Sequence, residues 1–317
     1  MKKRILAIII AALALIMNVT AISFADEAAA ESEPSNEADV ESEYTDEAAE
    51  ATTPEVNKDS SIGIRYISFG TGDKTMVIIP GLSMQHVTDS AQAIAESFAG
   101  FGTEYTVYLF DIRDEVPEDY SIAQMGEDLV TIIKELGLSD LYIYSASLGG
   151  MQAVYIAAHY PDLVNRLVIA SSTCASNDAI NNAAGGWIEL AEAGDKQQLL
   201  DNMAQLIYSP AVYEAYKDVL TAGADAITDE VLARFINTAH VLLNIDLDEE
   251  ASAITCKTFV VGSEGDEVIG IDGIKHLADT IKDCSSFIYG DEYGHAVYDE
   301  AADFKQLMAD FFEIDIN

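Results

Sequence analysis

The chain has 317 residues, and its 16 Lys and Arg are far outnumbered by 55 Asp and Glu, which gives a formal net charge of −39 at pH 7. Half of the residues are hydrophobic, which is enough apolar material for a globular core, so the chain as a whole is not disordered. Nucleic-acid binding depends on Lys and Arg displacing counterions from phosphates, and the one basic cluster is residues 2–4. The composition therefore excludes a nucleic-acid-binding protein and disfavours acidic membrane surfaces and polyanionic substrates as partners.

Residues 1–25 have the pattern of a secretory signal peptide. The basic residues 2–4 precede an unbroken apolar run of 13 residues, and Ser23 and Ala25 supply the small side chains of a cleavage site after Ala25. The run falls short of the ~20 apolar residues that a spanning helix needs, although an uncleaved membrane anchor is the alternative. We expect a secreted or cell-envelope protein with no stable membrane span after cleavage.

Residues 26–59 differ sharply in composition from the C-terminal part of the chain. They hold 13 acidic residues and a single Lys, without apolar periodicity, so they cannot bury enough surface to offset the entropy of ordering. We expect a disordered acidic linker here, then one folded domain over residues 60–317, and we find no internal repeat.

The domain begins with alternating strand and helix patterns. Strands are predicted over residues 62–69, 76–80, 105–111, 141–145 and 166–171, and helices over 89–98, 122–136 and 148–159. The same alternation returns near the C-terminus, with strands over 258–261 and 286–289 and helices over 271–281 and 301–312. Near-continuous apolar strands that alternate with amphipathic helices are typical of a parallel sheet covered on both faces. We therefore predict an α/β fold with a mostly parallel sheet of seven or eight strands.

The region between these two blocks is helical throughout. Over residues 176–250 the apolar residues recur at helical spacing, and Ser209-Pro210 forms a cap and first-turn pair. An all-helical insertion between two late strands predicts a cap over one edge of the sheet. Its aromatic residues could line a pocket or pack between helices, and they are Trp187, Tyr208, Tyr213, Tyr216 and Phe235.

The strongest chemical signal is the run Ser145-Ala146-Ser147-Leu148-Gly149-Gly150, which comes after an apolar strand and opens a helix. A Ser at such a tight turn is exposed at the carboxyl edge of the sheet, and the helix N-terminus offers N–H groups to a developing oxyanion. This run resembles the nucleophile elbow G-x-S-x-G of the α/β-hydrolase superfamily, with Ser145 in place of the first Gly. The alternative is a Ser that only caps the helix, with glycines present for packing.

The resemblance extends to the order of the remaining residues. The superfamily places an acid and then a His after the nucleophile, and here Asp266 and His295 follow late strands at the same sheet edge. Asp266 is preferred as the acid and Glu264 is the alternative. His86 could face the site, whereas the other three histidines are interpreted as surface or packing residues, and these are His159, His240 and His276.

The resemblance also implies an oxyanion hole. The loop Ile79-Pro80-Gly81-Leu82 occupies the position of the usual His-Gly loop, with Pro80 in place of His. Because the donors are backbone groups, we propose the N–H groups of Leu82 and Leu148. The nearby Asp111 and Arg113 are assigned a structural role.

The combination is similar to the capped, serine-nucleophile, esterase- or lipase-like branch of the superfamily over about residues 62–315. It implies the α/β-hydrolase fold and a secreted serine hydrolase that cleaves a carboxylic-ester-like bond through Ser147, His295 and Asp266. The alternatives are the same triad with lactonase, thioesterase, peptidase, perhydrolase or carbon–carbon hydrolase chemistry, or a catalytically silent binding module.

The ligands can be inferred from the same residues. We find no metal-ligand cluster, phosphate loop or dinucleotide motif and expect no cofactor or metal. The negative charge predicts a neutral ester as the small-molecule substrate. Of the three cysteines, Cys256 and Cys284 precede late strands and could form a disulfide, or all three, with Cys174, could be free. The sequence does not specify the oligomeric state.

Overall fold

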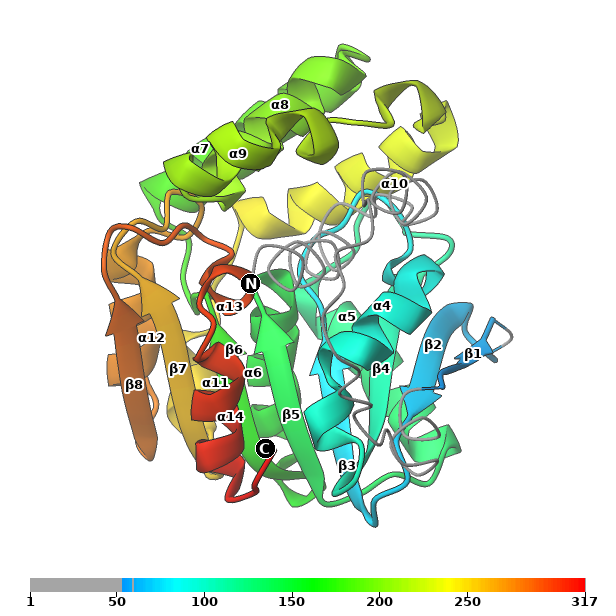
Figure 1. Ribbon diagram of the computed structural model, residues 1–317, viewed down its shortest axis with the longest axis vertical. Coiled ribbons are helices and arrows are strands. Elements are labelled where there is room, and N and C mark those ends of the chain that lie inside the picture. The colour runs from blue at the N-terminus through cyan, green and yellow to red at the C-terminus, as the bar shows by residue number, and fades with distance from the viewer. Residues whose placement is uncertain (1–52, 59, 317) are drawn as a thin grey trace, which may run out of the picture.

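The structure is a computed structural model that describes residues 53–58 and 60–316 (Figure 1). The predicted signal peptide and most of the predicted acidic linker lie outside the described residues. Within them, one eight-stranded sheet has the order β1-β2-β4-β3-β5-β6-β7-β8. Its strands are β1 Glu55–Asn57, β2 Ile64–Phe69, β3 Lys74–Ile79, β4 Tyr105–Arg113, β5 Leu141–Ala146, β6 Val164–Ala170, β7 Lys257–Ser263 and β8 Cys284–Tyr289.

The sheet is mostly parallel, as predicted. Only β2 runs antiparallel to its neighbours β1 and β4, and every pairing from β4 through β3 to β8 is parallel. The carboxyl ends of the parallel strands therefore meet at one edge, where ligands bind in open α/β sheets. The last four residues of each of the central strands β3, β5 and β6 are buried, which accounts for the apolar runs at these strand ends.

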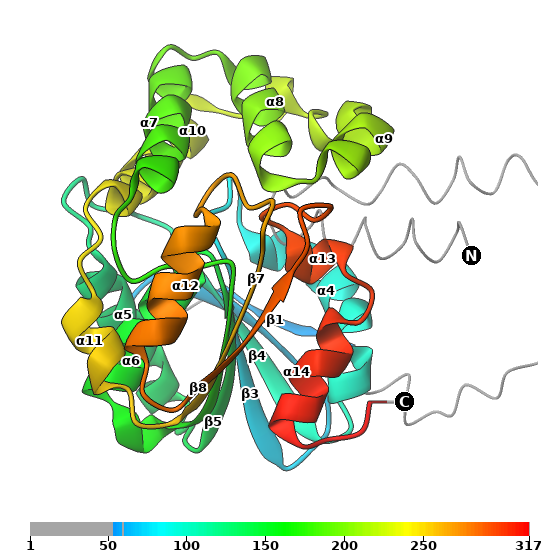
Figure 2. The same ribbon diagram turned by 90° about the vertical axis from the view of Figure 1, so that its left-hand side faces the viewer.

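Helices cover both faces of the sheet. Figure 2 shows α5, α6, α11 and α12 on one face and α4 and α14 on the other. Their bounds are α4 Ala91–Ser97, α5 Ile122–Glu135, α6 Leu148–His159, α11 Asp248–Ala253, α12 Ile271–Thr280, α13 Val297–Glu300 and α14 Phe304–Phe312. In α5, Ser121 caps the first turn by accepting from the N–H of Gln124, and the apolar side faces the core.

Four further helices stand above the carboxyl edge of the sheet (Figures 1 and 2). They are α7 Asp178–Glu192, α8 Lys196–Ile207, α9 Pro210–Leu220 and α10 Asp229–His240, all between β6 and β7. Each is capped by a side chain, and Ser209 accepts from the N–H of Val212 with Pro210 in the first turn, which confirms that cap prediction. These four helices are called the cap below.

Most element boundaries differ from prediction by a few residues, and two of these differences have a clear local cause. Residues 55–57, placed in the disordered linker, form the edge strand β1, because Val56 and its neighbours pair with residues 66–68 of β2. The strand predicted from residue 62 begins at Ile64, since Gly63 adopts a positive φ of 69° that ends extended backbone. Among the described residues no helix has the length and apolar character that a bilayer crossing requires.

Candidate active site

Ser147 occupies a strained turn between β5 and α6. Its backbone has φ 52° and ψ −122°, a conformation that costs a non-glycine residue about 1–3 kcal/mol. The neighbouring strand holds the turn, because the N–H of Ser147 donates to the carbonyl of Ala170 at 2.9 Å and the Ser172 hydroxyl donates to the carbonyl of Ser147 at 2.7 Å. The surrounding fold thus fixes a serine side chain at the carboxyl edge of the sheet.

The residues that flank Ser147 are small for a steric reason. A Cβ on Gly149 would lie 2.1 Å from the carbonyl oxygen of Ile79, so only glycine fits. At the other flank, the Ser145 hydroxyl donates to the carbonyl of Val168 at 3.0 Å within the sheet. This bond explains how the turn accommodates Ser145 where the elbow motif has Gly.

His295 and Asp266 meet at the same edge. His295 Nδ1 lies 2.9 Å from Asp266 Oδ2, and both side chains are almost fully buried. The other carboxylate oxygen, Oδ1, accepts from the backbone N–H groups of Val268 and Ile269 at 2.9 and 2.8 Å. Glu264, the alternative acid, is exposed to solvent. The structure therefore brings Asp266, and not Glu264, to His295.

The loop that carries His295 is anchored to the cap. The N–H of Ala296 donates to the carbonyl of Ile207 at 2.8 Å, and a Cβ on Gly294 would lie 2.6 Å from the backbone nitrogen of Ser209. That nitrogen donates to Glu300 Oε1 at 2.8 Å. The position of His295 thus depends on the turn between α8 and α9.

The loop after β3 passes directly over Ser147. A Cβ on Gly81 would lie 3.1 Å from Ser147 Cβ and 3.6 Å from Ser147 Oγ. Leu82 comes next after this glycine, and Leu148 is the first residue of α6, so its N–H has no acceptor within the helix. The backbone segments that carry the two predicted oxyanion donors therefore flank the serine.

A small cavity connects these parts. It has a volume of about 20 Å³, which is room for about one water molecule. Its floor includes Ser147, His295 and Leu82, and its roof comes from the cap; the lining residues are Gly81, Leu82, Ser147, Trp187, Met203, Ile207, Leu242, His295 and Tyr298. Ser147 and His295 thus face one small, largely apolar space.

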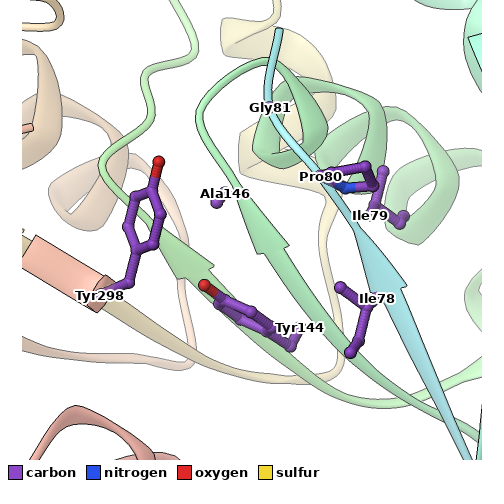
Figure 3. Close-up of a pocket in the computed structure, with 7 residues that line it drawn as sticks. All are labelled: Ile78, Ile79, Pro80, Gly81, Tyr144, Ala146 and Tyr298. Carbon is purple, nitrogen blue, oxygen red and sulfur yellow. The ribbon is translucent and has the colours of Figure 1, made fainter. Parts of the chain in front are cut away.

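A second cavity of about 10 Å³ lies behind the loop after β3 (Figure 3). Tyr298 borders both cavities. Figure 3 shows that its hydroxyl points toward the carboxyl edge of the sheet, where β5 ends at Ala146. Burial, followed by the charge of Asp299, raises the pKa of Tyr298 well above its ordinary value, so the phenol stays neutral.

Comparisons with known proteins agree with this architecture. A family model described as the alpha/beta hydrolase fold matches residues 74–197. The chain is 23% identical to RutD of Rhizobium rhizogenes, a proposed carbamate hydrolase, over 71% of this chain and 86% of the relative. It is 18% identical to 3-oxoadipate enol-lactonase 2 of Acinetobacter baylyi, over 69% of this chain and 82% of the relative.

A solved structure matches as well. The crystal structure of MGS-M2, an alpha/beta hydrolase enzyme from a Medee basin deep-sea metagenome library, superposes with a TM-score of 0.72 at 23% identity, over 82% of this chain and 97% of the other. The protein therefore has the α/β-hydrolase fold. It is an enzyme of the hydrolase class.

The cap residues of this α/β-hydrolase divide between pocket and packing. Of the five aromatic residues singled out, Trp187 lines the cavity beside Ser147. Its indole Nε1 is buried and has no hydrogen-bond partner among the described residues. Tyr208 and Phe235 are buried in the hydrophobic core. The sequence does not distinguish Trp187 from the other cap aromatics, since it does not show which of them faces the serine.

His86, which could have faced the site, takes part in a link between the α/β-hydrolase core and its cap. Its Nδ1 lies 3.3 Å from Asp111 Oδ2 and 3.3 Å from a guanidinium nitrogen of Arg234 on α10. Arg234 also donates to the carbonyl of Met84 at 3.2 Å, and Asp111 accepts from Thr88. The contacts of Asp111 fit the structural role assigned to it.

Proposed function

We propose that the protein is a serine hydrolase of carboxylic-ester-like bonds, with Ser147 as nucleophile, His295 as general base and Asp266 as the orienting acid. The observation that carries this proposal is the strained backbone of Ser147 beside the same small cavity as His295, whose Nδ1 is paired with Asp266. A strained serine, a buried imidazole and a buried carboxylate at one sheet edge form the constellation that acyl transfer requires.

In the proposed reaction, His295 Nε2 accepts the proton of the Ser147 hydroxyl while Oγ attacks the substrate carbonyl. The N–H groups of Leu82 and Leu148 donate to the resulting oxyanion. Imidazolium then protonates the leaving alkoxide, and the carbon–oxygen bond breaks to give an acyl-enzyme. Water, deprotonated by His295, attacks the acyl-enzyme and restores Ser147. Asp266 holds the Nδ1–H tautomer throughout, since its Oδ2 accepts from Nδ1.

The apolar lining favours a small, neutral acyl group. The cavity holds only about one water molecule, so a larger acyl chain needs the cap to move away from the sheet edge. A cyclic ester is the specific alternative, because one relative is named as an enol-lactonase. Matched linear esters and lactones of equal carbon number distinguish the two substrates by kcat/KM.

The direct test is labelling with a fluorophosphonate probe. The wild type should be labelled, whereas Ser147→Ala and His295→Ala should not. Labelling that persists in Ser147→Ala would assign the nucleophile elsewhere. A folded wild type that neither reacts with the probe nor hydrolyses any ester would favour the silent binding module.

We also propose that the protein is exported and cut after Ala25. The support is the order of basic residues, apolar run and small residues at the N-terminus. N-terminal sequencing of the protein from an exporting host should begin at Asp26. A full-length chain that stays in the membrane fraction would support the uncleaved anchor instead.

A further inference from the structure

Three metal-binding side chains from distant parts of the sequence meet beside the stem of the cap. Cys174 comes after β6, Asp248 begins α11, and His276 lies on α12. The Cys174 thiol donates to Asp248 Oδ1 at 3.2 Å, and His276 Nε2 lies 2.8 Å from the same oxygen. One ligand atom from each residue lies within 4.8 Å of the other two.

This spacing suits a tetrahedral ion. Zinc binds Cys, His and carboxylate at about 2.3, 2.0 and 2.0 Å, so ligand atoms around it stand roughly 3.3–3.6 Å apart. Cys174 is fully buried, while the side chains of Asp248 and His276 are 50% and 46% exposed. An ion can therefore approach from solvent between the two exposed side chains and reach the sulfur beneath them.

The donor set selects the class of ion. A sulfur and an imidazole nitrogen favour zinc over calcium or magnesium, which take oxygen ligands. Three protein ligands leave the fourth position of the tetrahedron to water on the exposed side. The Thr280 hydroxyl donates to the backbone carbonyl of His276 at 2.7 Å, one turn further along α12.

We propose that Cys174, Asp248 and His276 form a zinc site that clamps the cap to the core. Cys174 and Asp248 lie on the two chain segments that lead into and out of the cap, and His276 lies on a core helix. The same segments are already tied by backbone bonds, because Leu247 N–H donates to the carbonyl of Cys174 at 2.8 Å and Ala175 bridges Asp246. Figure 2 shows α11 and α12 next to each other below the cap.

The site is separate from the proposed active site. None of its ligands lines the cavity beside Ser147. All three cysteines are free thiols, so Cys256 and Cys284 do not form the disulfide considered above, and Cys174 is available as a ligand. The proposal therefore stands or fails independently of the proposed esterase activity.

The test uses the reduced full-length protein with Zn²⁺ and with Co²⁺ as its spectroscopic substitute. The wild type should bind one ion per chain, develop a thiolate-to-cobalt charge-transfer band, and melt several degrees higher with Zn²⁺. Cys174→Ser, Asp248→Asn and His276→Gln should each weaken binding by more than the roughly 10–100-fold that loss of an outer partner costs.

Matched controls separate this site from nonspecific binding. Cys256→Ala and Cys284→Ala retain the proposed ligands, and His159→Gln removes the exposed histidine that lies 3.5 Å from Glu250 of α11. These controls should keep the charge-transfer band and the rise in melting temperature. His276 is exposed, so His276→Gln should fold even where Cys174→Ser does not. A wild type without the band, or a band unchanged in a folded His276→Gln or Cys174→Ser, would overturn the proposal.

Discussion

His295 Nδ1 and Asp266 Oδ2 are 2.9 Å apart, and the second oxygen of Asp266 is held by two backbone N–H groups. This arrangement fixes both the tautomer and the orientation of the imidazole. Asp266→Asn should therefore lower kcat toward esters by about 10⁴-fold without unfolding the protein. Steady-state kinetics measure the loss of kcat, and a thermal melt checks that the variant remains folded.

The matched control for this prediction is Glu264→Gln. Glu264 lies two residues away and is exposed, so its substitution should leave kcat within about a factor of two. An equal loss of kcat in Asp266→Asn and Glu264→Gln would contradict the role proposed for Asp266.

Replacing either of two glycines by alanine should have opposite effects on the stability of the protein. Gly149→Ala places a Cβ 2.1 Å from the carbonyl oxygen of Ile79, so β3 or α6 must shift, at a cost of about 1–3 kcal/mol or more. Gly185 is in the middle of α7 with nothing within 4 Å of the added carbon, so Gly185→Ala should stabilise the protein by about 0.5–1 kcal/mol.

Urea denaturation of both variants measures the difference in their free energies of unfolding. Ester hydrolysis gives a second, independent readout of the site. Gly149→Ala should also lose activity, because the shifted loop carries Leu82 toward or away from Ser147. Equal stability of Gly149→Ala and wild type would show that the elbow has more room than the structure indicates.

The fold and the position of the nucleophile were predictable because both depend on local pattern. Continuous apolar strands specified the parallel sheet, and small residues around Ser147 specified the turn, where Gly149 meets the carbonyl of Ile79. The resemblance already favours Asp266 over Glu264, but the physical reason for that choice lies in how the loop after β7 folds. That loop is set by the backbone bonds of Val268 and Ile269, which no residue pattern reveals.

Contacts between distant segments were harder to predict. Cys174 and Asp248 are 74 positions apart, and Asp248 and His276 are 28 positions apart, without the short ligand spacing of a metal motif. The sequence alone therefore indicates only a surface or packing role for His276. Trp187 is one of five cap aromatics with similar patterns, and only the docking of α7 over the sheet brings it to the pocket.

Trp187 provides a test of the pocket's polarity. Its ring lines the cavity beside Ser147, and its buried Nε1 has no partner among the described residues, so we expect this N–H to donate to a substrate oxygen. Trp187→Phe should lower kcat/KM by about fivefold to tenfold for esters with an oxygen in the acyl chain, which is the value of one hydrogen bond. For esters with purely alkyl acyl chains, the same substitution should lower kcat/KM much less. Equal losses for both substrate series would assign Trp187 to packing alone.

Asp299 predicts how stability depends on pH. Burial raises the pKa of Asp299 well above its ordinary value, partly opposed by Lys305, whose own pKa is lowered by burial to about 8. The Oδ2 atom of Asp299 has no hydrogen-bond partner in the described part of the chain. A carboxyl whose folded pKa is raised contributes stability at low pH, and that contribution is lost as pH rises through the folded pKa.

Asn does not titrate, so Asp299→Asn should gain stability relative to wild type as pH rises from about 4 to 8. Loss of the carboxylate also lowers the pKa of Lys305 further, which acts in the same direction because the lysine then loses its buried charge at a lower pH. Urea denaturation at several pH values measures this slope. Asp310→Asn, which replaces an exposed acid on α14, is the matched control. Its stability relative to wild type should change little with pH. A slope of the opposite sign would mean that the ionised carboxylate stabilises the fold.

The charge of the protein predicts a preference among substrates. With a formal net charge of −39, the surrounding field should repel an anionic ester during its approach and attract a cationic one. A neutral ester should therefore have a kcat/KM roughly tenfold or more above that of its carboxylate-bearing analogue of equal size at low salt. Added salt should narrow this gap, because the Debye length falls to about 8 Å at physiological ionic strength. An ammonium-bearing analogue separates charge from size, since it should show the reverse salt dependence. If the difference in kcat/KM between the two esters does not change with salt, contacts within the pocket would explain the preference. Trp187 and Tyr298 would then be the residues to test next.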